Sequence, residues 1–152
     1  MPPLIAMKII AIDPGASGSV CYYDGNSVRA HNMPETVGDL IEFFRTIDKD
    51  TVVVMEEVSG FIGKPHPGSR MFNFGLGYGQ LQGVIQTLGF RLELVRPLKW
   101  QKALGLHRRK GMTPSEWKRK LRAEAQRLYP DIKVTLKTAD ALLILEYQRR
   151  KK

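Results

Sequence analysis

Two short apolar runs, each ending on a carboxylate, constrain the fold of this chain most strongly. Residues 7–13, MKIIAID, form a hydrophobic strand pattern that ends on Asp13, and residues 51–58, TVVVMEEV, lead to Glu56 and Glu57. A continuously apolar run such as the second is typical of a central strand that is buried on both faces. The sequence therefore predicts a sheet whose inner strands carry acids to their C-terminal ends.

The remaining patterns place further strands and helices around these two runs. Residues 24–26, DGN, lie between β-branched and aromatic residues and indicate a hairpin, which gives three antiparallel strands in succession. Apolar residues at helical spacing follow over 37–47 and 71–88, and residues 91–95, RLELV, form a further short strand. The glycines within 71–88 suggest a helix that packs closely against the sheet or against a partner.

The C-terminal third of the chain is predicted to be helical. Pro97 starts a basic helix, and a capping box of Thr113 and Glu116, with Pro114 between them, starts a second helix that should run to about Tyr129. A last helix has Asp140 near its start. The order β-β-β-α-β-α-β-α-α-α predicts an α/β fold with a mixed five-stranded sheet flanked by helices, as a single domain over 1–152 with a short extension at 1–6.

Charge and composition indicate the class of partner. The chain of 152 residues has 24 Lys and Arg against 15 Asp and Glu, a formal net charge of +9. A cationic surface of this kind attracts polyanions, so nucleic acid is the expected partner and an anionic membrane the weaker alternative. The single Cys21 is expected to be a small buried hydrophobe, and the sequence shows no membrane-spanning run and no signal peptide. We therefore expect a soluble intracellular protein.

Three acids are positioned to meet at one edge of the predicted sheet. Asp13 and Glu56 end strands, and Asp140 lies at the start of the last helix. Carboxylates gathered in one place repel one another unless they are protonated or bind a hard cation such as Mg²⁺. Two of them also have structural explanations, because Asp-Pro-Gly is good turn chemistry and an acid stabilises the first turn of a helix.

The motifs IIAIDPGASGSV, VVVMEEV, FNFGLGYGQLQGVI, RPLKWQKALGL and TADALLILEY resemble those of the RuvC-type Holliday junction resolvases, particularly their compact phage-encoded relatives. The resemblance extends over almost the whole chain. It implies an RNase H-like fold, a homodimer, and Mg²⁺- or Mn²⁺-dependent hydrolysis of phosphodiesters at four-way DNA junctions. It implies no nucleotide cofactor and no membrane, and it places the protein in the cytoplasm of a bacterial or phage-infected cell.

The resemblance also implies roles for individual residues. Asp13 matches the first-strand metal ligand, which would bridge two metal ions, and Glu56 and Asp140 match the other two acids. Glu57 has some chance of ligation, although family members often have a neutral polar residue there. Lys137 departs from the pattern, since many members have an acid or histidine at this position. Lys137 would then contact the scissile phosphate, or else point to solvent.

The basic segments predict the DNA-binding surface. Acidic residues are almost absent between Lys99 and Arg122, which favours phosphate contact over an ordinary solvated face. Phe61 lies where family members place an aromatic side chain that stacks on junction bases, although it could equally cover the core. Trp100 and Trp117 are expected in the core. The predicted DNA-binding residues are Phe61, Lys64, Arg70, Lys99, Lys102, Arg108, Arg109, Lys110 and Lys118.

Other functions share parts of this pattern. A related nuclease of the same fold could act on other branched DNA or on RNA–DNA hybrids, and a relative with a damaged site could bind DNA without cutting it. The first strand also resembles that of the ATPase and sugar-kinase superfamily, but that fold needs two lobes and this chain has room for one. The glycine-rich helix over 71–88 is our candidate for the dimer surface.

Overall fold

The computed structural model describes residues 7–58 and 68–151. Its strands are β1 (Ile9–Asp13), β2 (Ser19–Tyr23), β3 (Val28–Asn32), β4 (Val52–Glu56) and β5 (Arg91–Val95). Its helices are α1 (Val37–Arg45), α2 (Gly68–Thr87), α3 (Pro97–Ala103), α4 (Pro114–Leu128) and α5 (Ala139–Arg150). The order of elements is the one that the sequence predicts.

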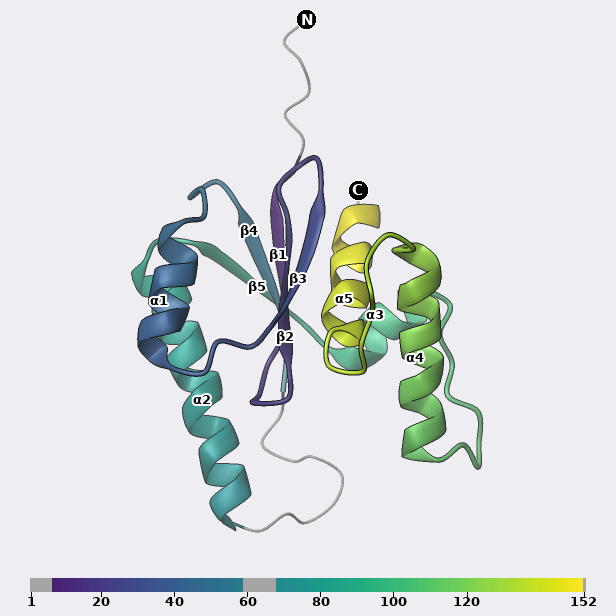
Figure 1. Ribbon diagram of the computed structural model, residues 1–152. Coiled ribbons are helices and arrows are strands. Elements are labelled where there is room, and N and C mark those ends of the chain that lie inside the picture. The colour runs from purple at the N-terminus through teal and green to yellow at the C-terminus, as the bar shows by residue number, and fades with distance from the viewer. Residues whose placement is uncertain (1–6, 59–67, 152) are drawn as a thin grey trace, which may run out of the picture.

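The five strands form one mixed sheet in the order β3-β2-β1-β4-β5. β2 is antiparallel to both of its neighbours, β1 and β3. β4 is parallel to both of its neighbours, β1 and β5. Helices α1 and α2 cover one face of the sheet, and α3, α4 and α5 lie on the other (Figure 1). The predicted α/β fold with a mixed five-stranded sheet flanked by helices is therefore confirmed.

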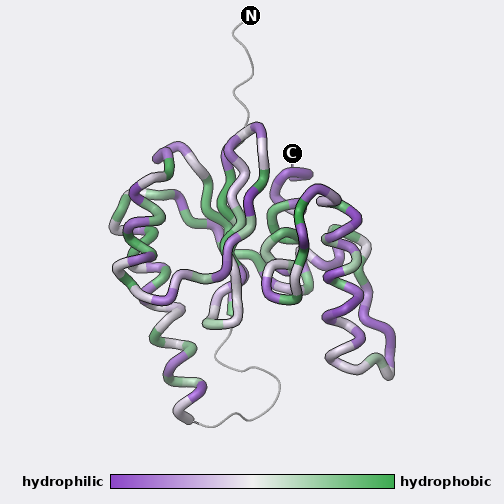
Figure 2. The backbone as a smooth tube through the Cα atoms, viewed as in Figure 1, coloured by the Kyte–Doolittle hydropathy of each residue, from purple (hydrophilic) through white to green (hydrophobic). Residues whose placement is uncertain are grey.

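Alternate residues of β1 enter two separate cores, because successive side chains of a strand point to opposite faces. Ile10 and Ile12 pack with residues of α1 and α2, while Ile9 and Ala11 pack with α5. Each fully buried aliphatic side chain of this size stabilises the fold by about 1.5–3 kcal/mol. Figure 2 shows green, hydrophobic stretches on strands in the middle of the molecule, with hydrophilic stretches among them. β1 is thus a fixed central strand, and its C-terminal residue, Asp13, is held in place by the whole sheet.

The turn between β1 and β2 is tight. It is closed by the Gly18 amide, which donates to the Gly15 carbonyl at 3.0 Å. A Cβ on Gly18 would lie 1.9 Å from the carbonyl oxygen of Asp13, so no other residue fits there without moving the strand end. Gly15 has a φ of +107°, in the region that favours glycine.

Helix α2 differs from the sequence-based expectation in two ways. It begins at Gly68 rather than Met71, because its first residues continue the helix without the apolar spacing that marks its later turns. Its glycines, such as Gly75 and Gly79, have open space around them and do not pack against the sheet. The helix does pack against the sheet, but through Leu81 and Ile85 rather than through its glycines, and packing of the glycines against a partner stays a prediction.

The N-terminal half of α2 extends beyond the end of the sheet, and the N-terminal end of α4 reaches past it on the other side (Figure 1). Only the later turns of α2 are anchored in the core, through Leu81 and Ile85. The N-terminal half of α2, residues 68–77, is called its free half. Phe72 and Leu76 on this free half are 69% and 50% exposed. None of the described helices is long and apolar enough to cross a membrane.

Candidate active site

The three acids singled out by the sequence lie at one end of the sheet. Asp13 ends β1 and Glu56 ends β4, and these parallel strands pair in a register that sets Ile12 beside Met55. The next residues of the two strands, Asp13 and Glu56, therefore follow side by side. Asp140 is the second residue of α5, which packs against β1 and its neighbours. Segments far apart in the sequence thus bring three carboxylates together.

The carboxylates act on one another electrostatically. Burial, followed by the neighbouring charges of Asp140 and Glu56, raises the pKa of Asp13 from 3.8 to about 8. Burial is also the main reason that the pKa of Glu56 rises from 4.5 to about 7, and Asp140 adds to it. Burial raises the pKa of Asp140 as well. Without a cation, the cluster retains protons near neutral pH.

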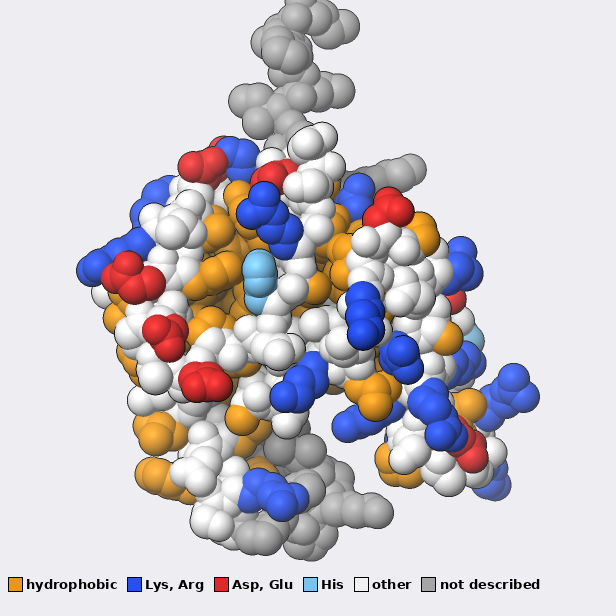
Figure 3. All heavy atoms as spheres, in the orientation of Figure 1, with side chains coloured by type: hydrophobic (Ala, Val, Ile, Leu, Met, Phe, Trp, Pro, Cys, Tyr) orange, Lys and Arg blue, Asp and Glu red, His pale blue; other side chains and the backbone are white. Residues whose placement is uncertain are grey.

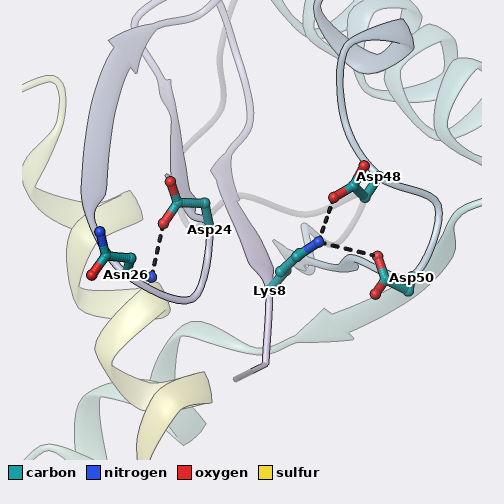
Figure 4. Close-up of polar contacts among 5 residues, drawn as sticks. All are labelled: Lys8, Asp24, Asn26, Asp48 and Asp50. Atoms are coloured by element: carbon teal, nitrogen blue, oxygen red, sulfur yellow. Dashed lines mark hydrogen bonds and ion pairs between the residues drawn. The ribbon is translucent and has the colours of Figure 1, made fainter. Parts of the chain in front are cut away.

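Other acids of the chain show what ordinary structural roles look like (Figure 4). Asp24, in the turn between β2 and β3, accepts the backbone amides of Asn26 and Ser27 at 2.8 and 2.7 Å, which lowers its pKa. Asp48 and Asp50 both pair with Lys8, which precedes β1 at its other end. Each of these carboxylates has a partner that stabilises its charge.

Asp13 has no such support. Within the described part of the chain its carboxylate accepts no hydrogen bond, and the turn that follows it is closed by the backbone alone. The turn-capping explanation for Asp13 therefore does not fit. Asp140 does lie in the first turn of α5, where the helix dipole favours a negative charge. That structural role is compatible with a place in the acidic cluster.

The two consecutive acids at the end of β4 have different surroundings. The indole of Trp100 donates a hydrogen bond from Nε1 to Oε2 of Glu56 at 2.9 Å. Glu57 instead pairs with Arg96, with 2.9 Å between Nε and Oε2, and its side chain is 41% exposed. Glu56 is thus the acid that belongs to the cluster. The pairing with Arg96 argues against Glu57 as a ligand, a role that stays untested.

A groove of about 1050 Å³ runs past the end of the sheet, and Asp13 and Asp140 both line it. Its walls come from the turn after β1, the segment between β3 and α1, the free half of α2, and Lys118 of α4. Figure 3 shows a recess between the lower ends of α2 and α4, with Lys and Arg side chains on its α4 side. Asp13 and Asp140 therefore face an open groove whose lining includes the positive charges of Arg70 and Lys118.

Among the described residues, Lys118 is the cation whose charge acts on Asp13 and Asp140. Its ammonium acts to lower the pKa of both Asp13 and Asp140, against the effect of burial. Lys137 is exposed, lies just before α5, and is not among the charges that shift the pKa of Asp140. The structure thus places Lys118, rather than Lys137, beside the carboxylates. The structure gives no contact that supports a phosphate-contacting role for Lys137, and this role remains a prediction.

Of the other predicted DNA-binding residues, some border the groove and others lie away from it. Arg70 of α2 lines the groove, whereas Lys99 lines a separate, smaller pocket next to β5. Lys102 on α3 and the three consecutive basic residues Arg108, Arg109 and Lys110 before α4 are exposed. Phe61 and Lys64 lie outside the described residues.

The donor set fits a hard divalent cation that is only partly held by protein. As the side chains lie, no three His, Cys, Asp or Glu side chains within 7–58 and 68–151 form a ready metal-binding group. Mg²⁺ needs only one or two carboxylates, with water and substrate phosphate completing its shell. Asp13 and Asp140, which share the groove, meet that requirement, and Glu56 is close enough to shift the pKa of Asp13.

Sequence reasoning missed two neighbours of the acids. Trp100 is in the core as expected, fully buried, but it also donates to Glu56. The signal was available, since a buried Trp N–H usually finds an acceptor and α3 follows the strand beside β4. Lys118 was predicted to contact phosphate, but its place next to Asp13 and Asp140 depends on how α4 packs against α5, which no local pattern shows.

Comparison with known proteins gives relatives in structure only. The sequence matches no known protein-family profile and no curated protein. The fold is similar to that of RuvC from Thermus thermophilus, with a TM-score of 0.57 and 18% identity over 93% of this chain and 92% of the other. It is also similar to T. thermophilus RuvC in complex with a Holliday junction substrate, with a TM-score of 0.59 and 14% identity over the same shares. The resemblance predicted from the motifs is confirmed for the fold.

Proposed function

We propose that this protein is a divalent-metal-dependent endonuclease that resolves four-way DNA junctions. The observation that carries the proposal is the meeting of Asp13, Glu56 and Asp140 at the end of the sheet, beside an open groove, in a fold shared with RuvC. The structural neighbour that holds a Holliday junction substrate supports branched DNA as the ligand. The net charge of +9 favours a polyanion in the groove.

The acids would hold the cation through their buried oxygens. Mg²⁺ or Mn²⁺, when bound, supplies an activated water and stabilises the leaving 3′ oxygen, which gives 5′-phosphate and 3′-hydroxyl ends. A bound cation would favour the charged form of Asp13 and Asp140, against the burial that raises the pKa of both carboxyl groups. Glu56, held by Trp100, keeps a fixed orientation beside them. Lys118 offsets the charge of the phosphate that enters the groove.

A homodimer would provide one such site for each of two strands of a symmetric junction. The free half of α2 is the candidate interface in this proposal, because Phe72 and Leu76 are exposed there and glycines such as Gly75 and Gly79 leave room for close approach. The core of an interface packs as densely as a protein interior, which requires close approach of the two surfaces. Sedimentation of the purified protein tests this part of the proposal, and a monomer at micromolar concentration contradicts it.

The decisive experiment compares the wild-type protein with Asp13→Asn, Glu56→Gln and Asp140→Asn on a labelled four-way junction with Mg²⁺. Each variant should lose cleavage while binding the junction with similar affinity, because the substitutions remove ligands and leave the basic surface unchanged. Flap, duplex and RNA–DNA hybrid controls separate junction resolution from the related nuclease activities. Junction binding without cleavage by the wild-type protein would instead identify a non-catalytic DNA-binding protein.

A further inference from the structure

The corner between β5 and α3 holds the end of β4 through three hydrogen bonds. The Glu57 amide donates to the Val95 carbonyl at 2.7 Å, Arg96 pairs with the Glu57 carboxylate, and the Trp100 indole donates to the Glu56 carboxylate. Both side chains that follow the apolar run of β4 are therefore fixed from the same neighbouring segment. The contact between Arg96 and Glu57 is on the surface, and the contact between Trp100 and Glu56 is in the interior.

The interior contact is made by a rigid donor. Pro97 is the first residue of α3, and three residues later Trp100 enters the core with no exposed surface. Its neighbours there belong to the cluster between the sheet and α5. A fully buried indole in close-packed surroundings cannot change its orientation without displacing them. The position of Nε1 is thus set by packing, independently of Glu56.

Glu56 gains its orientation from this donor. A glutamate side chain has three rotatable bonds, and a carboxylate at the end of a strand would otherwise sample several conformations. The hydrogen bond from Trp100 fixes Oε2 and leaves Oε1 without a described protein donor. The register of β1 and β4 sets Glu56 beside Asp13 at the end of the sheet, so the carboxylate so fixed lies next to the other strand-end acid.

We propose that Trp100 is a positioning residue, whose indole N–H holds Oε2 of Glu56 so that Oε1 is presented toward Asp13 and Asp140. This inference rests on the proposed function for its catalytic consequence. Its structural content, the bond and its effect on cation binding, is independent of which DNA is cut. Partners behind a ligand typically contribute about 10-fold to 100-fold in metal affinity or activity.

The chain provides its own control. It has two tryptophans, and Trp117 of α4 packs into the same core as Trp100 at 9% exposure. Within the described part of the chain Trp117 donates no hydrogen bond, and Lys120 lies over its ring at 5.8 Å. Trp→Phe at either position removes a similar buried surface, but only Trp100→Phe removes a donor to the acidic cluster.

The first measurement tests the bond itself in the whole protein by ¹⁵N NMR of the two indole groups. Trp117→Phe assigns the two signals. The Trp100 indole proton should exchange slowly with solvent, and Glu56→Gln should shift its signal while leaving that of Trp117 in place. A Trp100 signal that does not respond to Glu56→Gln overturns the proposal, whether or not any Trp100 variant folds.

The second measurement tests positioning through Mn²⁺ binding, followed by electron paramagnetic resonance of the free ion. Trp100→Phe should weaken Mn²⁺ binding by about 10-fold or more, and Trp117→Phe by less than about 2-fold. Replacement of Trp100 by 3-benzothienylalanine, which keeps the shape and lacks the N–H, should reproduce the effect of Phe. Equal Mn²⁺ affinity in the wild type and both Trp100 variants overturns the proposal.

Cleavage assays then separate this inference from the proposed function. At saturating junction, Trp100→Phe should cut about 10-fold to 100-fold more slowly in a single turnover, with unchanged junction affinity, while Trp117→Phe cuts at nearly the wild-type rate. A Trp100→Phe variant as fast as the wild type refutes the positioning role and leaves the proposed function intact. A wild-type protein that binds Mn²⁺ but cuts no substrate refutes the proposed function, and the Mn²⁺ affinities still decide the role of Trp100.

Discussion

Removing the charge of Asp13 is expected to stabilise the protein when no divalent cation is present. In the unfolded chain this carboxyl group has its ordinary pKa of 3.8, and in the folded protein burial and two neighbouring acids raise the pKa to about 8. Between these two pH values the folded state retains a proton that the unfolded state has released. The free energy of unfolding therefore falls as the pH rises through this window, and Asp13→Asn is free of that loss.

The size of the effect follows from the two pKa values. A difference of about four pH units corresponds to about 6 kcal/mol, at about 1.4 kcal/mol for each unit. Entry of water and local relaxation around an ionised buried carboxylate reduce this value. We expect Asp13→Asn to exceed the wild type by about 2–5 kcal/mol at pH 9 and to match it within about 1 kcal/mol near pH 4. The gain equals the free energy by which the buried charge of Asp13 destabilises the wild-type protein.

Urea unfolding in EDTA from pH 4 to pH 9 measures the difference, with Asp24→Asn as the control. Asp24 is already stabilised by two backbone amides, so its substitution should give no gain at any pH. Millimolar Mg²⁺ at pH 8 should stabilise the wild type and leave Asp13→Asn unchanged. A variant that is less stable than the wild type at pH 9 in EDTA, or a difference that does not depend on pH, would refute the reasoning.

Three further predictions test other parts of the structure. Gly18→Ala should destabilise the protein by about 1–3 kcal/mol or more in urea unfolding, because the added Cβ meets the Asp13 carbonyl oxygen. Gly83→Ala on α2 should stabilise the protein by up to about 1 kcal/mol, because the space around Gly83 is open and Ala favours the helix. Lys118→Met should slow single-turnover cleavage at saturating junction by about 10-fold to 100-fold, and Lys137→Met should change only the affinity for DNA; the reverse pattern would restore Lys137 as the residue at the phosphate. Junction affinity should fall by about 10³-fold between about 50 and 200 mM salt if six or more Lys and Arg contact phosphates, and a flat titration would contradict a phosphate-dominated interface.

The fold could be predicted from the sequence because its main signals are local. The apolar runs of β1 and β4 identify strands that are buried on both faces, and the capping box at Thr113 sets the start of α4 within one residue. Convergence of Asp13 and Glu56 then follows from strand polarity, since parallel strands end at the same edge, whereas Asp140 is brought to them by the packing of α5 against β1. These features do not depend on which side chains meet across the core.

The surroundings of the acids could not be predicted in the same way. The sequence leaves open whether Lys137, three residues before Asp140, contacts phosphate or points to solvent, whereas the cation whose charge acts on Asp140 is Lys118, which arrives through the packing of α4 against α5. Likewise, the length of α2 exceeds its apolar pattern, because its first turns touch no core and carry no periodic signal. Contacts between elements distant in the sequence depend on side-chain shape and helix placement, which single-sequence patterns do not contain.

The pairing of β1 with β4 has a consequence for how such proteins diverge. The spatial separation of Asp13 and Glu56 is set by one ladder of backbone hydrogen bonds, while the chain between them passes through β2, β3 and α1 before it returns. Insertions or deletions in the hairpin loop or beside α1 would change the number of residues between the two acids without moving either of them. The number of residues between the two acids can therefore change in related chains while the geometry of the site stays the same. Strand order is thus a better guide to relatedness here than a motif of fixed length.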